Sequence, residues 1–157
     1  MLRRTPRERT LEAVQSLELP EPVWRTCPWQ PRRLIAVGLH QWLRCAGEAL
    51  RADQVIGMPS RAVDEAWHGL ILCTARYATF CDDAYGRFLH HHPEGDGQGS
   101  GDPMANQLAR TVIAWTRVRR SGEECVLWDL DDLVGVADPW GIPAGRVAQV
   151  ESHIAGP

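Results

Sequence analysis

Apolar residues recur at three- and four-residue intervals along most of this chain, whereas the period-2 alternation of a half-buried strand is nowhere sustained. Prolines and glycines separate the stretches that keep this helical spacing. The stretches are residues 10–20, 32–50, 60–84, 103–120, 125–136 and 142–154. The pattern therefore predicts an all-α fold of about five or six helices.

Two segments fall outside this pattern. Residues 94–103 are rich in glycine and aspartate, bury little apolar surface and are expected to form a mobile loop. Residues 1–9 carry four arginines and predict a basic, flexible arm. The chain has 157 residues, a length that suits one hydrophobic core. We therefore expect a single compact domain over residues 1–157 that includes a Gly-rich loop.

Charge and composition narrow the classes of partner. Seventeen basic against twenty acidic residues give a net charge of −3, so the chain lacks the basic field that favours nucleic-acid binding. No apolar run reaches the length of about 20 residues that spans a membrane. The first residues lack the apolar core of a secretory signal, and the five cysteines form no C-x-x-C pair. We expect a cytoplasmic protein whose partner is a small molecule or another protein.

The candidate chemistry is concentrated between residues 63 and 94. In the predicted helix, Asp64 and His68 lie one turn apart on the same face, and Glu65 lies three residues before His68. Three consecutive histidines at 90–92 offer further nitrogen ligands. Carboxylate and neutral imidazole are ordinary ligands of zinc and ferrous iron. The predicted metal ligands are Asp64, His68, His90 and His91, with Glu65 as the catalytic base.

Chain length limits how these residues meet. His68 lies sixteen residues before the expected helix end at position 84, a distance of about 24 Å at the helical rise. The seven residues from 84 to 91 span at most about 23 Å when extended. The histidines therefore reach His68 only if the helix ends early or the chain runs straight back. Gly86 is the predicted corner.

A set of short motifs resembles a known family. The motifs are Met58-Pro59-Ser60, Val63-Asp64, Trp67-His68, Thr74, Tyr77, Phe80-Cys81, Gly86 and His90-His91, followed by LWDLDDLVG from Leu127 to Gly135. They are similar to a small bacterial group related to the glycine-rich domain-containing protein family, over residues 33 to 140.

This resemblance implies a role for the predicted metal ligands, but the family has no agreed chemistry and so implies no substrate. In plants the family is associated with stress and development. The glycine-rich and RNA-recognition-like segments of the plant members are absent here, so RNA binding does not carry over.

Two classes of function fit the sequence. The first is a mononuclear zinc or non-haem iron protein, in which Asp64, His68 and His91 hold the metal and leave a position open for water or substrate. A small metalloenzyme of unassigned substrate belongs to this class. The second is a metal-free helical scaffold or protein-binding module, in which the Asp/His cluster is a structural hydrogen-bond network. In that class one of the tryptophans, Trp24, Trp29 or Trp140, would contact the partner.

Overall fold

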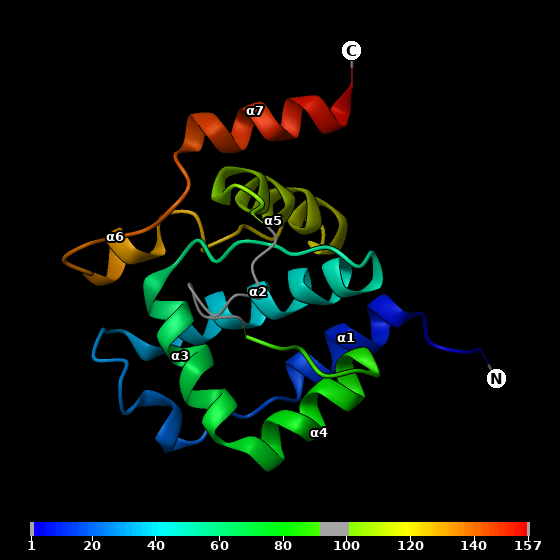
Figure 1. Cartoon of the computed structure of the whole chain (residues 1–157), viewed down its shortest axis with the longest axis vertical. Helices are drawn as coiled ribbons and strands as arrows, with labels where there is room; N and C mark the ends of the chain where they lie inside the picture. Colours follow the sequence, from blue (N-terminus) through cyan, green and yellow to red (C-terminus); the bar gives the residue numbers. More distant parts are fainter. Residues whose placement is uncertain (1, 92–100, 157) are drawn as a thin grey trace.

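The computed structural model describes residues 2–91 and 101–156. Within these ranges the chain folds into seven α-helices and one short 3-10 helix, without a strand (Figure 1). They are α1 (Pro6–Gln15), η1 (Glu21–Trp24), α2 (Arg32–Arg51), α3 (Arg61–Leu72), α4 (Thr74–Tyr85), α5 (Met104–Val118), α6 (Leu130–Val134) and α7 (Ala144–Ala155). The all-α prediction is confirmed, with slightly more helices than expected.

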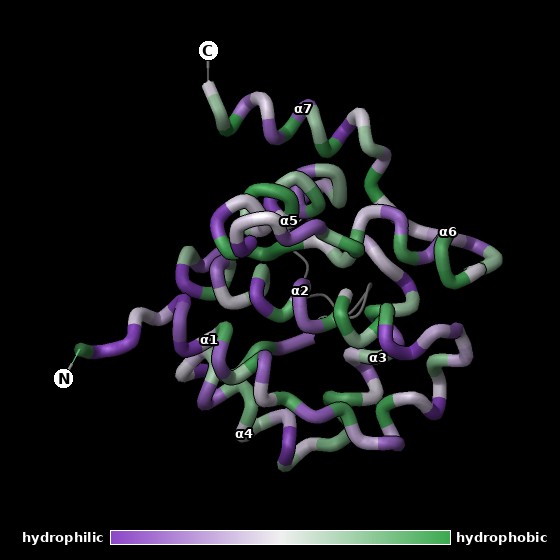
Figure 2. Tube along the Cα trace, turned by 180° about the vertical axis from the view of Figure 1, so that it is seen from behind, coloured by the Kyte–Doolittle hydropathy of each residue, from purple (hydrophilic) through white to green (hydrophobic). Residues whose placement is uncertain are grey.

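Helix α2 runs through the middle of the molecule. It packs against α5 on one side and against α1 and α4 on the other, while α3 crosses nearby (Figure 1). Helix α7 lies on the outer side of α5 (Figure 1). Hydrophilic and hydrophobic residues are interspersed along both of these helices (Figure 2). The described residues form one compact helical domain. None of the described helices combines the length and the apolar character that a membrane crossing requires.

Three apolar clusters hold the described residues together, and the smallest joins α2 to α5. The larger cluster is built around α2, whose Ile35, Leu39 and Leu43 are completely buried. A smaller cluster joins α5 to α7, with Val112 and Val147 among its buried members. Because α2 contributes its apolar stripe to the larger cluster, the helices that surround it are held in fixed positions relative to one another.

The predicted helix over residues 60–84 is wrong as a single element. Cys73 has a non-helical ψ of 65°, and the chain turns there between α3 and α4. Helix α4 then runs back along α1 and ends at Gly86, whose left-handed φ of 69° suits glycine. The predicted corner at Gly86 is therefore confirmed, and a second corner at Cys73 precedes it.

The two irregular segments predicted from the sequence are only partly described. Helix α1 begins at Pro6, where Thr5 and Glu8 form a capping box, so the last four residues of the predicted arm are helical. Of the predicted loop at 94–103, residues 94–100 lie outside the described residues, as does His92.

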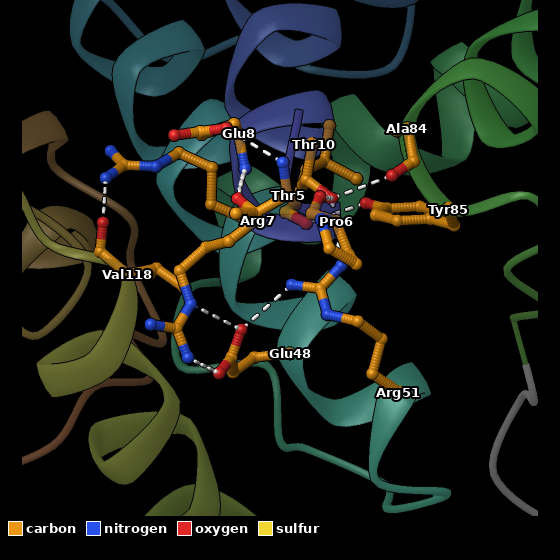
Figure 3. A network of polar contacts seen from close by, with 12 residues as sticks. Thr5, Pro6, Arg7, Glu8, Thr10, Glu48, Arg51, Ala84, Tyr85 and Val118 are labelled. Atoms are coloured by element: carbon orange, nitrogen blue, oxygen red, sulfur yellow. Dashed lines mark hydrogen bonds and ion pairs between the residues drawn. The ribbon is translucent and has the colours of Figure 1, made fainter. Parts of the chain in front are cut away.

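A polar network ties α1 to α2 and α4 (Figure 3). The carboxylate of Glu48 on α2 accepts hydrogen bonds from Arg7 on α1 and, at 2.8 Å, from Arg51 one turn further along α2. The hydroxyl of Thr10, which is buried, donates to the carbonyl of Ala84 at 2.7 Å. These contacts fix the end of α4, and with it the start of the segment that leads to His91.

Candidate metal centre

The start of α3 is fixed by two capping side chains. Ser60 Oγ accepts a hydrogen bond from the backbone N–H of Val63 at 3.1 Å. Asp131 on α6, which is almost completely buried, accepts hydrogen bonds from Ser60 Oγ at 2.8 Å and from the backbone N–H groups of residues 61 and 62. A carboxylate at a helix N-terminus also interacts favourably with the helix dipole. The first turn of α3, which carries Asp64, is therefore anchored to α6.

Sequence reasoning did not select Asp131 as a positioning residue. It is one of three aspartates in the run LWDLDD, and its spacing does not distinguish it from the other two. Only the tertiary contact between α6 and α3 gives it a function.

The return segment after α4 is fixed by Tyr77. Its hydroxyl donates a hydrogen bond to the carbonyl of Leu89 at 2.5 Å and accepts one from Trp67 Nε1 at 3.2 Å. The ring of Trp67 also packs against the ring of His91, with 4.7 Å between centroids. Leu89 is two residues before His91, so these contacts place the His91 ring beside α3.

Asp64, His68 and His91 converge at this point. The two histidine Nε2 atoms are 2.7 Å apart. Asp64 Oδ2 lies 3.5 Å from His68 Nε2, and Asp64 Oδ1 lies 3.5 Å from His91 Nε2. One oxygen or nitrogen atom from each residue lies within 4.8 Å of the others. Because α3 ends at Leu72 rather than near residue 84, the segment after α4 is long enough for His91 to reach His68.

These separations can be compared with those around a bound metal. Two ligand atoms at tetrahedral positions, each about 2.1 Å from zinc, lie about 3.4 Å apart. Each histidine nitrogen lies 3.5 Å from a different oxygen of Asp64, which is close to this value, and one ligand atom from each residue lies within 4.8 Å of the others. The distance of 2.7 Å between the histidines is a hydrogen bond, in which one ring donates to the other. To ligate one metal, the two nitrogens must move apart by roughly 0.7 Å.

The three side chains are partly shielded from solvent. Asp64 is 16% exposed, His91 22% and His68 37%. Burial raises the pKa of Asp64 above its ordinary value, although the charges of His68 and His91 and a hydrogen bond with His91 oppose that rise. A cation bound between these groups would stabilise the charged form of the Asp64 carboxylate, which burial has separated from water.

The other predicted site residues lie beside this group. Glu65 Oε2 is 3.9 Å from His68 Nδ1, which is the ring nitrogen that faces away from His91. The ring of His90 packs against Phe88, with 4.8 Å between centroids, and is not one of the three converging residues. The structure thus brings together three of the four predicted ligands, and it places Glu65 next to the Nδ1 atom of His68.

A cavity of about 780 Å³ lies next to the three converging residues. Asp64, His68 and His91 line one part of it. The rest is formed by α2, the segment before α3, residues 87–90, the start of α5 and the segment around residue 140. A small molecule in this cavity would be able to contact the Asp64–His68–His91 group.

No curated protein and no solved structure matches the chain. A model of the UCP032817-like family matches residues 24–111, which include α2, α3, α4 and all three converging residues. The predicted relation to the glycine-rich domain-containing protein family is therefore wrong, because the family whose model matches is a different one. The match covers more than half of the chain. The chain belongs to the UCP032817-like family.

Proposed function

We propose that this protein binds one divalent metal ion, zinc or ferrous iron, through Asp64, His68 and His91. The observation that carries the proposal is the convergence of one ligand atom from each residue within 4.8 Å. Two imidazoles and one carboxylate form the ligand set of several catalytic zinc sites and of the non-haem iron facial triad. Three protein ligands leave at least one position for water or substrate, and the neighbouring cavity of about 780 Å³ supports a role in small-molecule chemistry.

Glu65 has a supporting role in this proposal. Its carboxylate lies near Nδ1 of His68, whereas the metal would bind at Nε2. Metal-bound histidines commonly donate their other N–H group to a carboxylate, which fixes the tautomer and the ring orientation. The distance of 3.9 Å is longer than a hydrogen bond, and a small rotation of the partly exposed Glu65 side chain would close it. We therefore assign Glu65 to the orientation of His68 rather than to proton abstraction.

The test is zinc stoichiometry measured on protein purified without a histidine tag. We expect one zinc per chain in the wild type and none in His68→Ala or His91→Ala. His153→Ala is the matched control, because His153 is exposed on α7 and forms a hydrogen bond with the Gln149 carbonyl in its own helix. Its zinc content should equal that of the wild type.

Chelation supplies a second measurement. A ligand that binds only the folded state stabilises it by about 2.7 kcal/mol when its free concentration is a hundredfold above Kd. EDTA should therefore lower the Tm of the wild type and leave the Tm of His68→Ala unchanged. Wild-type protein that neither takes up zinc or ferrous iron nor responds to EDTA would exclude the metal site.

A second candidate function is favoured by the hydrogen bond of 2.7 Å between His68 and His91. In this case Asp64, His68 and His91 form a metal-free network inside a helical scaffold or protein-binding module. Asp64→Asn and His68→Ala would then destabilise the protein, and EDTA would have no effect. The partner-binding tryptophan would be Trp140, which is 44% exposed, because Trp24 and Trp29 pack against the core.

A further inference from the structure

We propose that the cavity beside the metal site binds a small monocarboxylic acid with an apolar body; this inference rests on the proposed metal function. The carboxylate would bind the metal, and the body would lie against the apolar wall of the cavity. The volume of about 780 Å³ falls in the range of small-molecule sites, roughly 300–1,000 Å³.

The apolar wall begins at the metal ligands. The ring of Trp67 lies between His91 and Trp42, with centroid distances of 4.7 Å to His91 and 4.5 Å to Trp42. Both tryptophans line the cavity, together with Met58 and Leu108. A ligand head at the metal would therefore be followed directly by aromatic and aliphatic side chains. This part of the lining is apolar and suits a hydrocarbon, whereas polar lining residues such as Asp53, Gln54 and Arg87 lie in the segments that follow α2 and α4.

The apolar wall is held in place by the backbone carbonyl and N–H groups of Gly57. The Gly57 carbonyl accepts hydrogen bonds from Trp42 Nε1 at 3.0 Å and from Thr111 Oγ1 at 2.8 Å. The Gly57 N–H donates to the carbonyl of Gln107 at 2.9 Å. The indole N–H of Trp42 is therefore already satisfied, and the segment before α3 is fixed to α5. A cavity with such fixed walls binds a ligand at a low cost in conformational entropy.

The charges around the cavity select the ligand head. A divalent metal bound by one carboxylate, Asp64, and two neutral histidines would carry a net charge of +1 on the cavity side, while the Glu65 carboxylate lies near Nδ1 of His68 and is not among the residues that line the cavity. Arg87 and Asp53, which also line the cavity, form an ion pair of 3.2 Å and neutralise each other. Among the described residues that line the cavity, a bound metal would therefore present a positive charge to a ligand. A monoanion neutralises this charge, whereas a cation would be repelled and a dianion would bring excess negative charge.

The experiment measures the affinity of zinc-loaded protein for acetate, butyrate, hexanoate and 4-phenylbutyrate, with 4-phenylbutyramide as the neutral analogue. Trp42 and Trp67 line the cavity, so tryptophan fluorescence is the readout. Cobalt-substituted protein adds a visible spectrum that responds to ligands at the metal. We expect the affinity to rise about fourfold with each added methylene, and the amide to bind far more weakly than the acid.

Variants locate the binding surface. Leu108→Gln places a polar group in the wall and should flatten the rise of affinity with chain length. Met104→Gln, at a cavity residue that is 58% exposed, tests the same point without a risk to folding. Ile154→Gln is the matched control, because Ile154 is 44% exposed on α7, away from the cavity. It should leave the whole series unchanged.

The possible failures are distinguishable. If zinc does not bind, the proposed function fails, and this inference fails with it. If zinc binds with the expected stoichiometry but hexanoate binds no better than acetate, the apolar site is refuted and the metal site stands. If the amide binds as tightly as the acid, the metal–carboxylate contact is refuted.

Discussion

At the scale of single residues, Tyr77 connects the proposed metal site to the rest of the fold. It is fully buried, and its hydroxyl bridges Trp67 on α3 and the Leu89 carbonyl on the return segment. The position of His91 results from the Tyr77–Leu89 hydrogen bond together with the packing of the Trp67 ring on the His91 ring.

Tyr77→Phe should therefore lower both stability and metal affinity. The substitution leaves the Trp67 N–H and the Leu89 carbonyl without this partner, at a cost of about 2 kcal/mol in the free energy of unfolding. It also loosens the segment that carries His91, so zinc affinity should fall about tenfold, as for other groups that orient ligands. Urea denaturation and zinc titration measure the two effects.

The second tyrosine of the chain is a matched control. Tyr85 is the last residue of α4, and its hydroxyl donates to the Leu43 carbonyl of α2 at 2.7 Å, whereas that of Tyr77 donates to the segment that carries His91. Tyr85→Phe should destabilise the protein by a similar amount and lower zinc affinity much less than Tyr77→Phe does. Equal losses of zinc affinity in both variants would mean that Tyr77 has no specific positioning role.

At the scale of elements, the close approach of η1 to α3 depends on Gly69. A Cβ atom at this position would lie 2.3 Å from the Val23 carbonyl oxygen. Because the obstacle is backbone, it cannot move aside as a flexible side chain would. Val23 itself is completely buried in the larger cluster, so η1 and α3 form one packed unit beside His68.

Gly69→Ala should therefore destabilise the protein by about 2 kcal/mol, even though alanine has the higher helix propensity. Gly145→Ala on α7 is the matched control, since a Cβ there meets no atom within 4 Å. That variant should be neutral or stabilising by up to about 1 kcal/mol. The comparison of the two denaturation midpoints is decisive: a midpoint for Gly69→Ala at or above the wild-type value would contradict the close packing.

The sequence pattern predicted the longer helices well, but it missed a break and misplaced the ends of α1 (Pro6–Gln15), which the stretch 10–20 covers only in part. The predicted helix over 32–50 agrees with α2, because the apolar spacing that follows Pro31 can be recognised from neighbouring residues alone. The break at Cys73 has no such signal, since both halves of the 60–84 stretch keep helical spacing and only one residue departs from helical geometry. The same limit applies to the site. The one-turn spacing of Asp64 and His68 is local, whereas the choice of His91 over His90 depends on the return path after Gly86.

At the scale of the whole molecule, two ion pairs, one largely buried and one with an exposed arginine, join segments that are distant in sequence. Arg44, which is 4% exposed, binds Glu123 at 2.8 Å and also donates to the Val118 carbonyl, which connects α2 to the end of α5. Glu48 joins α2 to α1 through Arg7 (Figure 3). Burial by itself raises the pKa of Glu48 and Glu123. The hydrogen bonds and charges of their arginine partners outweigh it, so the pKa of each carboxyl group lies below its ordinary value.

These lowered pKa values predict the behaviour of the protein in acid. A carboxyl group whose pKa is lower in the folded than in the unfolded chain contributes stability that is fully present above its unfolded pKa, about 4.3 for glutamate. This contribution is lost as the pH falls from there through the folded pKa, because the unfolded chain takes up the proton first. The free energy of unfolding should therefore decrease below pH ~4.3. Urea denaturation between pH 6 and pH 3, in the presence of EDTA to exclude metal release, measures this decrease.

The double variant Glu48→Gln/Glu123→Gln tests whether these two groups are responsible. It removes both titrating carboxyl groups, so its unfolding free energy should be lower than that of the wild type at pH 6. The difference should then narrow as the pH falls, because the wild type loses the same interactions by protonation. Glu151→Gln, at an exposed position of α7, is the control and should follow the wild-type curve. If the double variant and the wild type instead remained separated by a constant free energy from pH 6 to pH 3, the acid sensitivity would have to come from other carboxyl groups.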